Sequence, residues 1–294
     1  MPFDIMMPFY GRFDHFRSAV ESVLAQSDPD WRLVVVDDVY PDLRPGQWLE
    51  SLQDERITYI RNTENLRPSR NYNKCIGLMR SEFAVIMGCD DVLRPNFVSR
   101  VKEIIAARPD AAIIQPGVSV IDENGAPSNP LADRVKSLYR AKGSGTRALS
   151  GEPLATSLLR GNWTYFPSLV WRVDELRSRT FRTDLDVVQD LAMLMQITMA
   201  GGVLVLDDVV CFEYRRHSTS VSAVTGPDGS KFKQEATLFR ETAAACTELG
   251  WRRAATAAKH HLTSRLNAAS ELPAALRARN SAGRRALLQH VFGS

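Results

Sequence analysis

Short apolar runs alternate with helical segments over the first hundred residues, and this alternation limits the fold more than any other feature of the sequence. The apolar runs are continuous and rich in β-branched residues, as expected for strands that are buried on both faces. Strands that alternate with helices indicate a parallel sheet with right-handed crossovers, so we expect an α/β fold. The expected strands are Asp4–Met7, Trp31–Val36, Ile57–Ile60 and Phe83–Met87, and the expected helices between them are Phe13–Gln26, Trp48–Leu52 and Ser69–Met79.

Acidic pairs follow two of the expected strands: Asp37-Asp38 after the second and Asp90-Asp91 after the fourth. In a parallel sheet, ligands bind beyond the carboxyl ends of the strands, where these carboxylates would gather. Gathered carboxylates repel one another unless a cation lies between them, and Mg²⁺ or Mn²⁺ is typically held by one or two carboxylates together with phosphate oxygens. The alternative is that each pair only begins the next helix, as Asp often does. Two such pairs on neighbouring strand ends favour a binding site.

Five short motifs follow one another along the chain. They are residues 4–11 (DIMMPFYG), 22–27 (SVLAQS), 33–38 (LVVVDD), 71–77 (NYNKCIG) and 83–95 (FAVIMGCDDVLRP). In this order they resemble the family 2 glycosyltransferases, which are inverting enzymes with the GT-A fold. The resemblance is continuous over residues 4–110 and returns in pieces up to Ser222. It implies a Rossmann-like, mostly parallel sheet flanked by helices, a nucleotide-sugar donor, and Mn²⁺ or Mg²⁺ as cofactor.

The resemblance also implies a role for individual residues on the donor side. Asp38 would accept a hydrogen bond from the base imide, with Asp37 near the nucleoside, and Asp90 would bind the metal with Asp91 in support. The other implied donor contacts are Pro8, Phe9, Tyr10, Arg70 and Cys89. Two departures stand out: Gly88 occupies the place of the first aspartate of the family's D-x-D motif, and Val39-Tyr40 replaces the usual G-S. The contact to the donor ribose and the loop after the first acidic pair must therefore differ from the family pattern.

Inversion needs a carboxylate that deprotonates the acceptor hydroxyl as it attacks the sugar. The resemblance places this base in an acidic pair at the start of a helix, which here is Gln189-Asp190. Asp190 is therefore the expected base, and Gln189 is expected beside the acceptor. Asp184 and Asp186 are less well aligned competitors, and a helix N-terminal Asp stabilised by the helix dipole is the plain alternative.

Segments outside these motifs supply the remaining candidates. Tyr214–Ser222 resembles the family's Y-R-x-H-x-x-S-x-S segment, which implies a metal contact for His217 and a contact of Arg216 with the β-phosphate. The alternative for this segment is a solvated loop without a function. Trp163 and Tyr165 lie where the family faces its acceptor, so they are acceptor candidates with a core role as the alternative. Gly143–Arg147 is similar to the phosphate loop of sugar nucleotidyltransferases. Because it lies far from the first strand, in a long surface excursion over residues 122–151, we expect a flexible loop there.

The C-terminal region is expected to be helical and basic. Helical runs are predicted at Phe232–Leu249, Arg252–Ala269 and Pro273–Leu288, and residues 251–294 hold eight Lys or Arg against one acidic residue. We divide the chain into a catalytic domain (1–226) and a helical extension (227–294). Within the catalytic domain, residues 1–110 would bind the nucleotide sugar and residues 111–226 would face the acceptor. Packing of the extension against the catalytic domain is favoured over a homodimer surface or contact with anionic lipid.

The net charge of +3 is too small to argue for a nucleic-acid partner. Four separated cysteines and the lack of a signal-like N-terminus predict a cytoplasmic protein with reduced thiols, with the inner face of the membrane as a second location. The sequence thus predicts an enzyme that transfers a sugar, with inversion, from a UDP- or dTDP-sugar to a hydroxyl of a glycan, glycolipid or small molecule. The alternatives are a sugar-1-phosphate nucleotidyltransferase and a non-catalytic sugar-nucleotide-binding module of the same fold.

Overall fold

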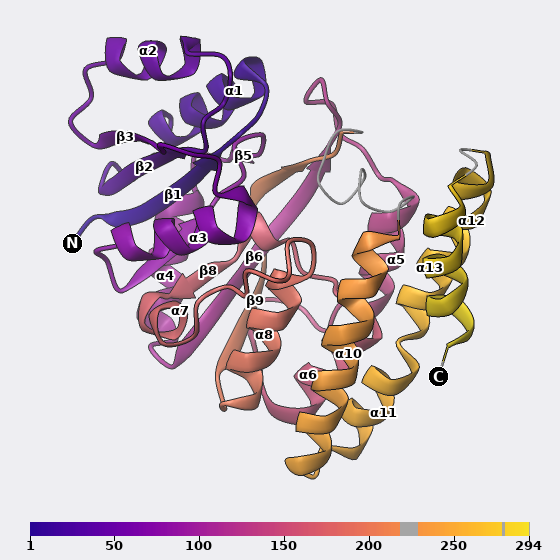
Figure 1. Cartoon of the computed structure of the whole chain (residues 1–294). Helices are drawn as coiled ribbons and strands as arrows, with labels where there is room; N and C mark the ends of the chain where they lie inside the picture. Colours follow the sequence, from indigo (N-terminus) through magenta and orange to yellow (C-terminus); the bar gives the residue numbers. More distant parts are fainter. Residues whose placement is uncertain (218–228, 278–279, 294) are drawn as a thin grey trace.

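The protein is built around one mixed β-sheet, which the computed structural model describes within residues 1–217, 229–277 and 280–293 (Figure 1). In spatial order the strands are β3 (Ile57–Arg61), β2 (Trp31–Asp37), β1 (Phe3–Phe9), β4 (Phe83–Ile86), β8 (Val170–Arg172), β6 (Ala111–Ile121), β9 (Val203–Arg215) and β5 (Val92–Leu93), and β7 (Arg147–Leu149) also pairs with β9. Strands β3, β2, β1 and β4 are parallel, as predicted. Strand β8 is antiparallel to both β4 and β6, and β5 is antiparallel to β9.

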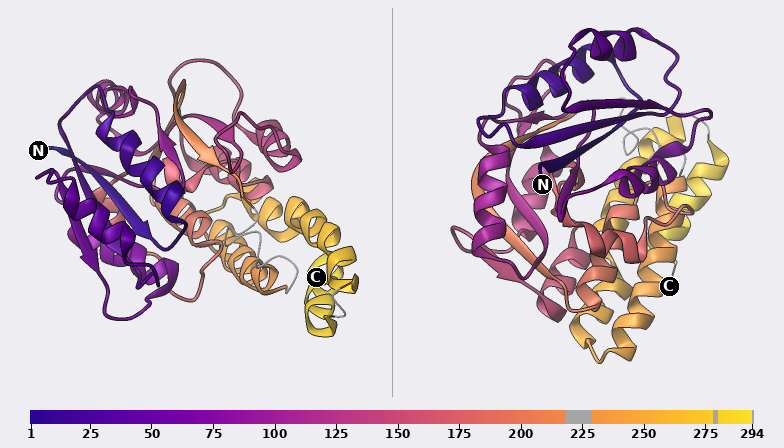
Figure 2. Two further views of the ribbon diagram at one scale, coloured as in Figure 1. Left: turned by 90° about the horizontal axis from the view of Figure 1, so that it is seen from above. Right: turned by 90° about the vertical axis from the view of Figure 1, so that its left-hand side faces the viewer.

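Helices cover both faces of this sheet (Figure 2). One face is covered by α1 (Phe13–Leu24), α2 (Arg44–Ser51) and α4 (Phe97–Ala107), and the other by α3 (Arg67–Leu78), α6 (Gly151–Arg160), α7 (Val173–Arg179) and α8 (Gln189–Met199). Helix α1 shows why these helices pack on the sheet: its apolar residues Phe16, Val20 and Val23 recur at helical spacing, form one face and are fully buried. The strands between these layers are buried on both sides, which explains their continuous apolar runs.

Strand β9 is much longer than the four apolar residues at its start suggest. It continues to Arg215 and pairs with β6 along most of its length, which brings the residues after Phe212 next to β5. The apolar segment Phe166–Trp171, whose pattern predicts a single strand, is divided into a 3₁₀ turn (Phe166–Ser168) and strand β8. Sequence patterns miss such changes because the polar residues of β9 after Leu206 interrupt its apolar run.

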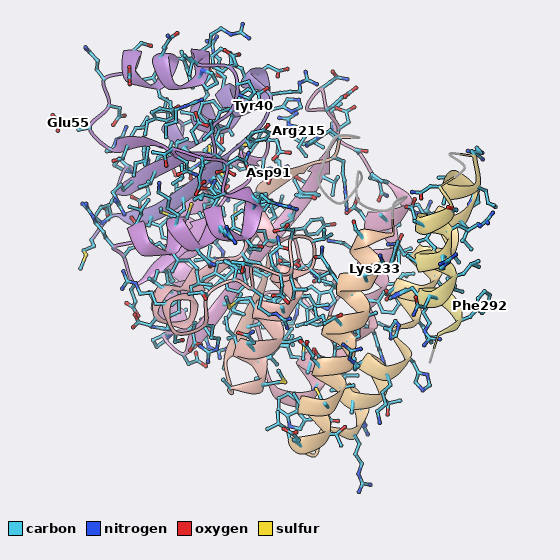
Figure 3. All side chains as sticks on the ribbon, viewed as in Figure 1. Tyr40, Glu55, Asp91, Arg215, Lys233 and Phe292 are labelled. Carbon is cyan, nitrogen blue, oxygen red and sulfur yellow. The ribbon has the colours of Figure 1, made fainter. Side chains whose placement is uncertain are left out.

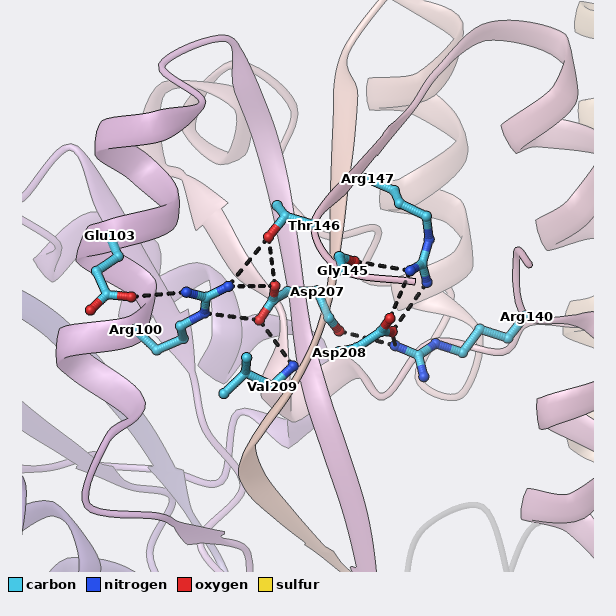
Figure 4. Close-up of polar contacts among 9 residues, drawn as sticks. All are labelled: Arg100, Glu103, Arg140, Gly145, Thr146, Arg147, Asp207, Asp208 and Val209. Atoms are coloured by element: carbon cyan, nitrogen blue, oxygen red, sulfur yellow. Dashed lines mark hydrogen bonds and ion pairs between the residues drawn. The ribbon is translucent and has the colours of Figure 1, made fainter. Parts of the chain in front are cut away.

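The excursion over residues 122–151 is more ordered than we expected. It contains helix α5 (Leu131–Tyr139), and two carboxylates of β9 hold its C-terminal segment (Figure 4). Asp207 accepts hydrogen bonds from Arg100 and Thr146, and Asp208 pairs with Arg147 at 2.7 Å. Arg140 also donates to Asp208, at 3.0 Å. The prediction of a flexible loop at Gly143–Arg147 is therefore wrong, because carboxylates distant in sequence fix its side chains.

The C-terminal helices are α10 (Ser230–Glu248), α11 (Arg252–His260), α12 (Leu262–Arg277) and α13 (Ser281–Phe292). The predicted run Arg252–Ala269 is broken at His261, whose φ of +29° ends α11, and Pro273 lies inside α12 instead of beginning a helix. Helices α10 and α11 contribute to the same apolar core as α6 and α8, which agrees with the favoured packing of this region, whereas α12 and α13 share a small separate cluster (Figure 1). Among the described residues, no helix combines the length and the hydrophobicity needed to cross a bilayer.

Candidate active site

The ends of β1, β2 and β4 meet the end of β9 at one edge of the sheet. Strand β5 follows the Asp90-Asp91 pair directly and pairs with β9 through Val92 and Glu213. This pairing brings Arg215 against Asp91, as Figure 3 shows, although the two residues are 124 positions apart in the sequence. Residues predicted from separate motifs thus come together here because of long-range strand pairing.

The Asp90-Asp91 pair is the centre of this edge. Asp91 is 1% exposed; its Oδ1 accepts a hydrogen bond from the backbone N–H of Arg215 at 2.8 Å, and its Oδ2 is buried without a hydrogen-bond partner among the described residues. Burial, and then the neighbouring Asp90 carboxylate, raise the pKa of Asp91 well above its ordinary value. His217 Nε2 lies 2.5 Å from Asp90 Oδ2. The structure therefore brings together the three predicted metal-binding residues Asp90, Asp91 and His217.

These residues fit a divalent cation incompletely. Two neighbouring carboxylates with a buried unpaired oxygen are suited to a hard cation, and a neutral His nitrogen can complete the protein ligands. Yet within residues 1–217, 229–277 and 280–293 no group of three or more His, Cys, Asp or Glu side chains is arranged to hold a metal ion. A cation here would therefore depend on oxygens from a bound diphosphate, as Mg²⁺ commonly does.

Gly88 lies directly against these carboxylates. A Cβ atom at this position would be 2.4 Å from Asp91 Oδ2 and 2.9 Å from Asp90 Oδ1. The observed arrangement of the acidic pair thus leaves no room for a side chain at residue 88. The departure from the D-x-D pattern has a steric reason, because the space of the first aspartate is taken by the side chains of the two that follow.

The first acidic pair is bound within the protein. Asp37 is fully buried and accepts hydrogen bonds from the Tyr59 hydroxyl, the Arg61 guanidinium and the backbone N–H of Tyr40. Burial, with the bond to Asp37, raises the pKa of Tyr59 to about 12. Three of the about four hydrogen bonds that a carboxylate can accept are thus made within the protein, which gives Asp37 a structural role, and its predicted place near the nucleoside stays a prediction.

Asp38 is engaged in a similar way. Its carboxylate accepts from Asn62 at 2.7 Å and from the backbone N–H groups of Leu66 and Arg67 at 2.7 and 2.9 Å. These bonds satisfy N–H groups at the start of α3. A carboxylate can accept about four hydrogen bonds, so one position remains for the predicted base contact, which stays a prediction.

The other predicted donor contacts differ in exposure. Phe9 is fully buried, with its ring 4.3 Å from that of Phe16, and therefore belongs to the core. Tyr10 is 56% exposed and makes an edge-to-face contact with Tyr40, with the ring centroids 5.3 Å apart. These two rings therefore border the end of β1, the strand that contains Pro8. Cys89 is partly buried, and burial raises its pKa, as does the adjacent Asp90. Arg70 is exposed on α3.

The predicted base lies at the start of α8. Asp190 Oδ2 accepts a hydrogen bond from the Asn162 amide at 2.9 Å, and burial raises the pKa of Asp190. Gln189 beside it is 7% exposed, and its Oε1 has no hydrogen-bond partner in the described residues. The competitor Asp184 is instead exposed and pairs with Arg182.

Tyr72 of α3 connects the two carboxylate sites, and the sequence did not single it out. Burial raises the pKa of its hydroxyl, and the Asp190 and Asp90 carboxylates raise it further through their charges. Its ring packs against Phe166 at 5.2 Å. The charges of Asp90 and Asp190 thus both act on the Tyr72 hydroxyl.

Arg216 and Tyr165 both bind the same residue of helix α5, Asp133. Asp133 accepts two hydrogen bonds from Arg216, at 2.8 and 3.0 Å, and a third from the Tyr165 hydroxyl at 3.0 Å. Sequence reasoning missed Asp133 because it lies in the excursion, where no motif marked it. Trp163 is 2% exposed and donates to Ser157, so it has the core role that we gave as its alternative. The predicted segment after His217, up to Ser222, lies outside the described residues.

Comparisons with known proteins identify the fold and family. Residues 4–165 match the profile of "Glycosyl transferase family 2". The putative colanic acid biosynthesis glycosyl transferase WcaA of Escherichia coli is 33% identical over 96 residues (32% of this chain, 34% of that protein). The succinoglycan biosynthesis protein ExoO of Rhizobium meliloti is 33% identical over 113 residues (38% and 31%). The matched segments span between 12% and 53% of the curated relatives' lengths.

Solved structures extend the likeness to the whole chain. S. aureus TarS 1-349 superposes with a TM-score of 0.66 at 14% identity, over 99% of this chain and 81% of that one. Its complex with UDP-GlcNAc gives a TM-score of 0.65 at 13% identity, over 100% and 93%. The GT-A-like fold and the family predicted from the sequence are thereby confirmed. Because the family profile covers more than half of its residues, the chain belongs to glycosyl transferase family 2.

Proposed function

We propose that the protein transfers a sugar from a UDP- or dTDP-sugar to a hydroxyl of a saccharide acceptor, with inversion and with Asp190 as general base. The observation that carries this proposal is the position of Tyr72, which lies within electrostatic range of both the Asp90 and the Asp190 carboxylates. A donor-side acidic pair and an acceptor-side carboxylate in one site are what a direct displacement at the anomeric carbon requires.

The donor is bound at the ends of β1 and β4 in this proposal. The exposed ring of Tyr10, beside Tyr40, offers a flat apolar surface on which a pyrimidine base can stack. TarS, which shares the fold, was solved with UDP and with UDP-GlcNAc, and this supports a uridine donor. Asp38 has one acceptor position left for the base imide.

A divalent cation would be held by Asp90 and His217, with Asp91 behind them. When bound, it would neutralise the negative charge of the diphosphate leaving group. Arg216 lies on the same side, and its guanidinium, now paired with Asp133, has the geometry for a bidentate contact with a phosphate.

Asp190 takes the proton of the acceptor hydroxyl. Its pKa is raised by burial, which brings it closer to neutral pH and makes the carboxylate a better proton acceptor. The Asn162 amide donates to Oδ2 and thereby orients the carboxylate. Gln189, with an unpaired buried oxygen, and Tyr165 offer polar and aromatic contacts to the acceptor.

The acceptor is a growing or repeating saccharide in this proposal. The matched relatives are named for colanic acid, succinoglycan and teichuronic acid biosynthesis, which are processes that assemble polysaccharides. The same names support the transferase over the nucleotidyltransferase and the non-catalytic module.

The test is release of nucleoside diphosphate from a panel of sugar nucleotides with Mn²⁺ and candidate saccharides. Asp190→Asn is expected to lower kcat by about 100-fold or more, with an unchanged Kd for the donor. Asp184→Asn is the matched control, because this exposed carboxylate lies in the same segment and should leave kcat unchanged. Release of pyrophosphate would support the nucleotidyltransferase, and donor binding without turnover would support the non-catalytic module. Full activity in Asp190→Asn would refute the base assignment.

A further inference from the structure

Lys136 of helix α5 is a partly buried cation that the proposed reaction leaves without a role. Its ammonium group donates a hydrogen bond to the backbone carbonyl of Thr164 at 2.6 Å and lies 4.3 Å from the centroid of the Tyr165 ring. It therefore clamps the segment that precedes the 3₁₀ turn from one side. An ammonium group withdrawn from water is costly unless its charge is used, because burial disfavours the charged form.

Hydrogen bonds on either side of residue Thr164 connect this ammonium group to the proposed base. Lys136 donates to the Thr164 carbonyl, the Thr164 hydroxyl donates to Asn162 Oδ1 at 2.7 Å, and the Asn162 amide donates to Asp190 Oδ2 at 2.9 Å. The Thr164 N–H also donates to Asn162 Oδ1, at 3.2 Å. These bonds fix which end of the Asn162 side chain faces Asp190: the oxygen is occupied by Thr164, so the N–H₂ group must point to the carboxylate.

The charges around Lys136 come from every element that packs on it. Two carboxylates act in its favour, Asp190 on α8 and Asp133 on its own helix, whereas Arg216 after β9 and Lys231 on α10 act against it. Burial is the largest influence and, with Arg216, lowers the pKa of Lys136 to about 8. In return, the Lys136 charge lowers the pKa of Asp190 against the opposing effect of burial. Tyr165 and Tyr214 are titratable groups on the Lys136 side, and burial keeps the pKa of both hydroxyls above its ordinary value. Tyr72 on α3 and Glu235 on α10 interact with the Asp190 charge, and burial raises the pKa of both.

We propose that Lys136 is a positioning residue for Asp190: it holds residues 162–165 so that the Asn162 amide faces the carboxylate, and its charge keeps that carboxylate ionised. This inference rests on the proposed role of Asp190 as base. It gives the excursion a function in catalysis, because helix α5 carries both Lys136 and Asp133 and is itself held by Asp208 through Arg140.

The experiment compares Lys136→Met, Lys136→Arg and the control Lys142→Met, an exposed lysine of the same excursion. Diphosphate release from the donor identified in the panel is followed from pH 5 to pH 10. Lys136→Met is expected to move the acidic limb of the kcat profile up by about one pH unit and so to lower kcat about tenfold at pH values below the wild-type limb, since a neighbouring opposite charge lowers a carboxylate pKa by one or more units. The alkaline limb near pH 8 should disappear. Lys136→Arg should restore the acidic limb without an alkaline limb, because arginine stays charged.

A role in packing alone would lower the melting temperature and kcat without moving either limb, and that result would overturn the proposal. If the panel gives no turnover, the Asp190 pKa is measured by ¹³C NMR titration of its carboxyl carbon, assigned with Asp190→Asn. An upward shift of about one unit in Lys136→Met, absent in Lys142→Met, supports the proposal, and an unchanged value refutes it. Activity that survives Asp190→Asn would instead remove the proposed base and leave the electrostatic result for Lys136 intact.

Discussion

Gly88 offers the sharpest test of how the acidic pair is built. A Cβ atom at residue 88 would lie 2.4 Å from Asp91 Oδ2, far inside any contact distance, so Gly88→Ala must push the Asp91 side chain away. Asp91 is 1% exposed, and its Oδ1 is the acceptor for the Arg215 N–H at 2.8 Å. Displacing it leaves a buried donor without a partner, which costs about 1–3 kcal/mol. A loss of about 2 kcal/mol corresponds to a melting temperature lower by about 4 °C in a chain of this size.

The same displacement should weaken metal-dependent donor binding. If the Asp90-Asp91 arrangement must be restored on binding, about 2 kcal/mol raises the apparent Mn²⁺ concentration for half-maximal diphosphate release about 30-fold. Gly88→Asp, which restores the first aspartate of the D-x-D pattern, should be at least as harmful as Gly88→Ala, because the steric conflict begins at Cβ. Family resemblance alone would predict a gain from this change.

Gly77→Ala is the matched control for this pair of variants. Gly77 lies in the last turn of α3, and a Cβ there would meet no atom within 4 Å. Alanine should stabilise the protein by up to about 1 kcal/mol through its higher helix propensity. Thermal unfolding and Mn²⁺ titration of all three variants decide the question. If Gly88→Ala melts with the wild type and Gly88→Asp binds Mn²⁺ more tightly, the reasoning on Asp91 is refuted.

Two further predictions concern buried charges outside the acidic pair at Asp90. Asp37→Asn should lower the free energy of unfolding by about 2 kcal/mol, because it leaves the partly exposed Arg61 guanidinium without its carboxylate. The Kd for UDP, measured by calorimetry, should stay unchanged. Unchanged stability together with weaker UDP binding would instead support Asp37 as a nucleoside contact. Burial, with His261 and Arg265, lowers the pKa of His290 to about 4, so between pH 6.5 and 4 the unfolded chain binds a proton that the folded chain does not. The free energy of unfolding should therefore fall as the pH falls through this window, by up to about 1.4 kcal/mol per pH unit. Chemical unfolding at pH 7 and pH 4.5 should show a smaller loss of stability in His290→Asn than in the wild type. An equal loss in both proteins would contradict this.

The N-terminal half of the sheet could be predicted because each strand is marked locally. Continuous apolar runs bounded by polar residues identify β1 to β4, and the position of Asp90-Asp91 just beyond β4 identifies the site edge. The place of Asp190 at the start of a helix was identified in a similar way, and its role as base stays a prediction. Local patterns suffice wherever a residue's role follows from its own secondary structure.

The rest could not be predicted because it depends on partners distant in sequence. Asp37 and Asp38 look alike as an exposed strand-end pair, yet β3 and the start of α3 bring donors that engage both of them. Lys136 and Asp133 carry no motif, and their functions arise only when α5 folds back on β9 and the 162–165 segment. Trp163 is aromatic, as a residue that stacks on an acceptor sugar would be, but it donates a hydrogen bond to Ser157 and is buried in the core.

Helix α10 shows that the C-terminal region belongs to the structure that supports the proposed base, Asp190. Gln234 Oε1 accepts hydrogen bonds from the backbone N–H groups of Asp186 and Val187, at 2.9 and 3.2 Å, and Arg182 in the same loop pairs with Glu241. This loop leads directly into α8, so α10 fixes the segment before the helix that carries Asp190. The same helix buries Leu238, Phe239 and Cys246 in the core that includes α6 and α8. Removing α10 would expose that apolar surface and release the loop before Asp190 together, so the helices after residue 229 and the catalytic sheet depend on one another.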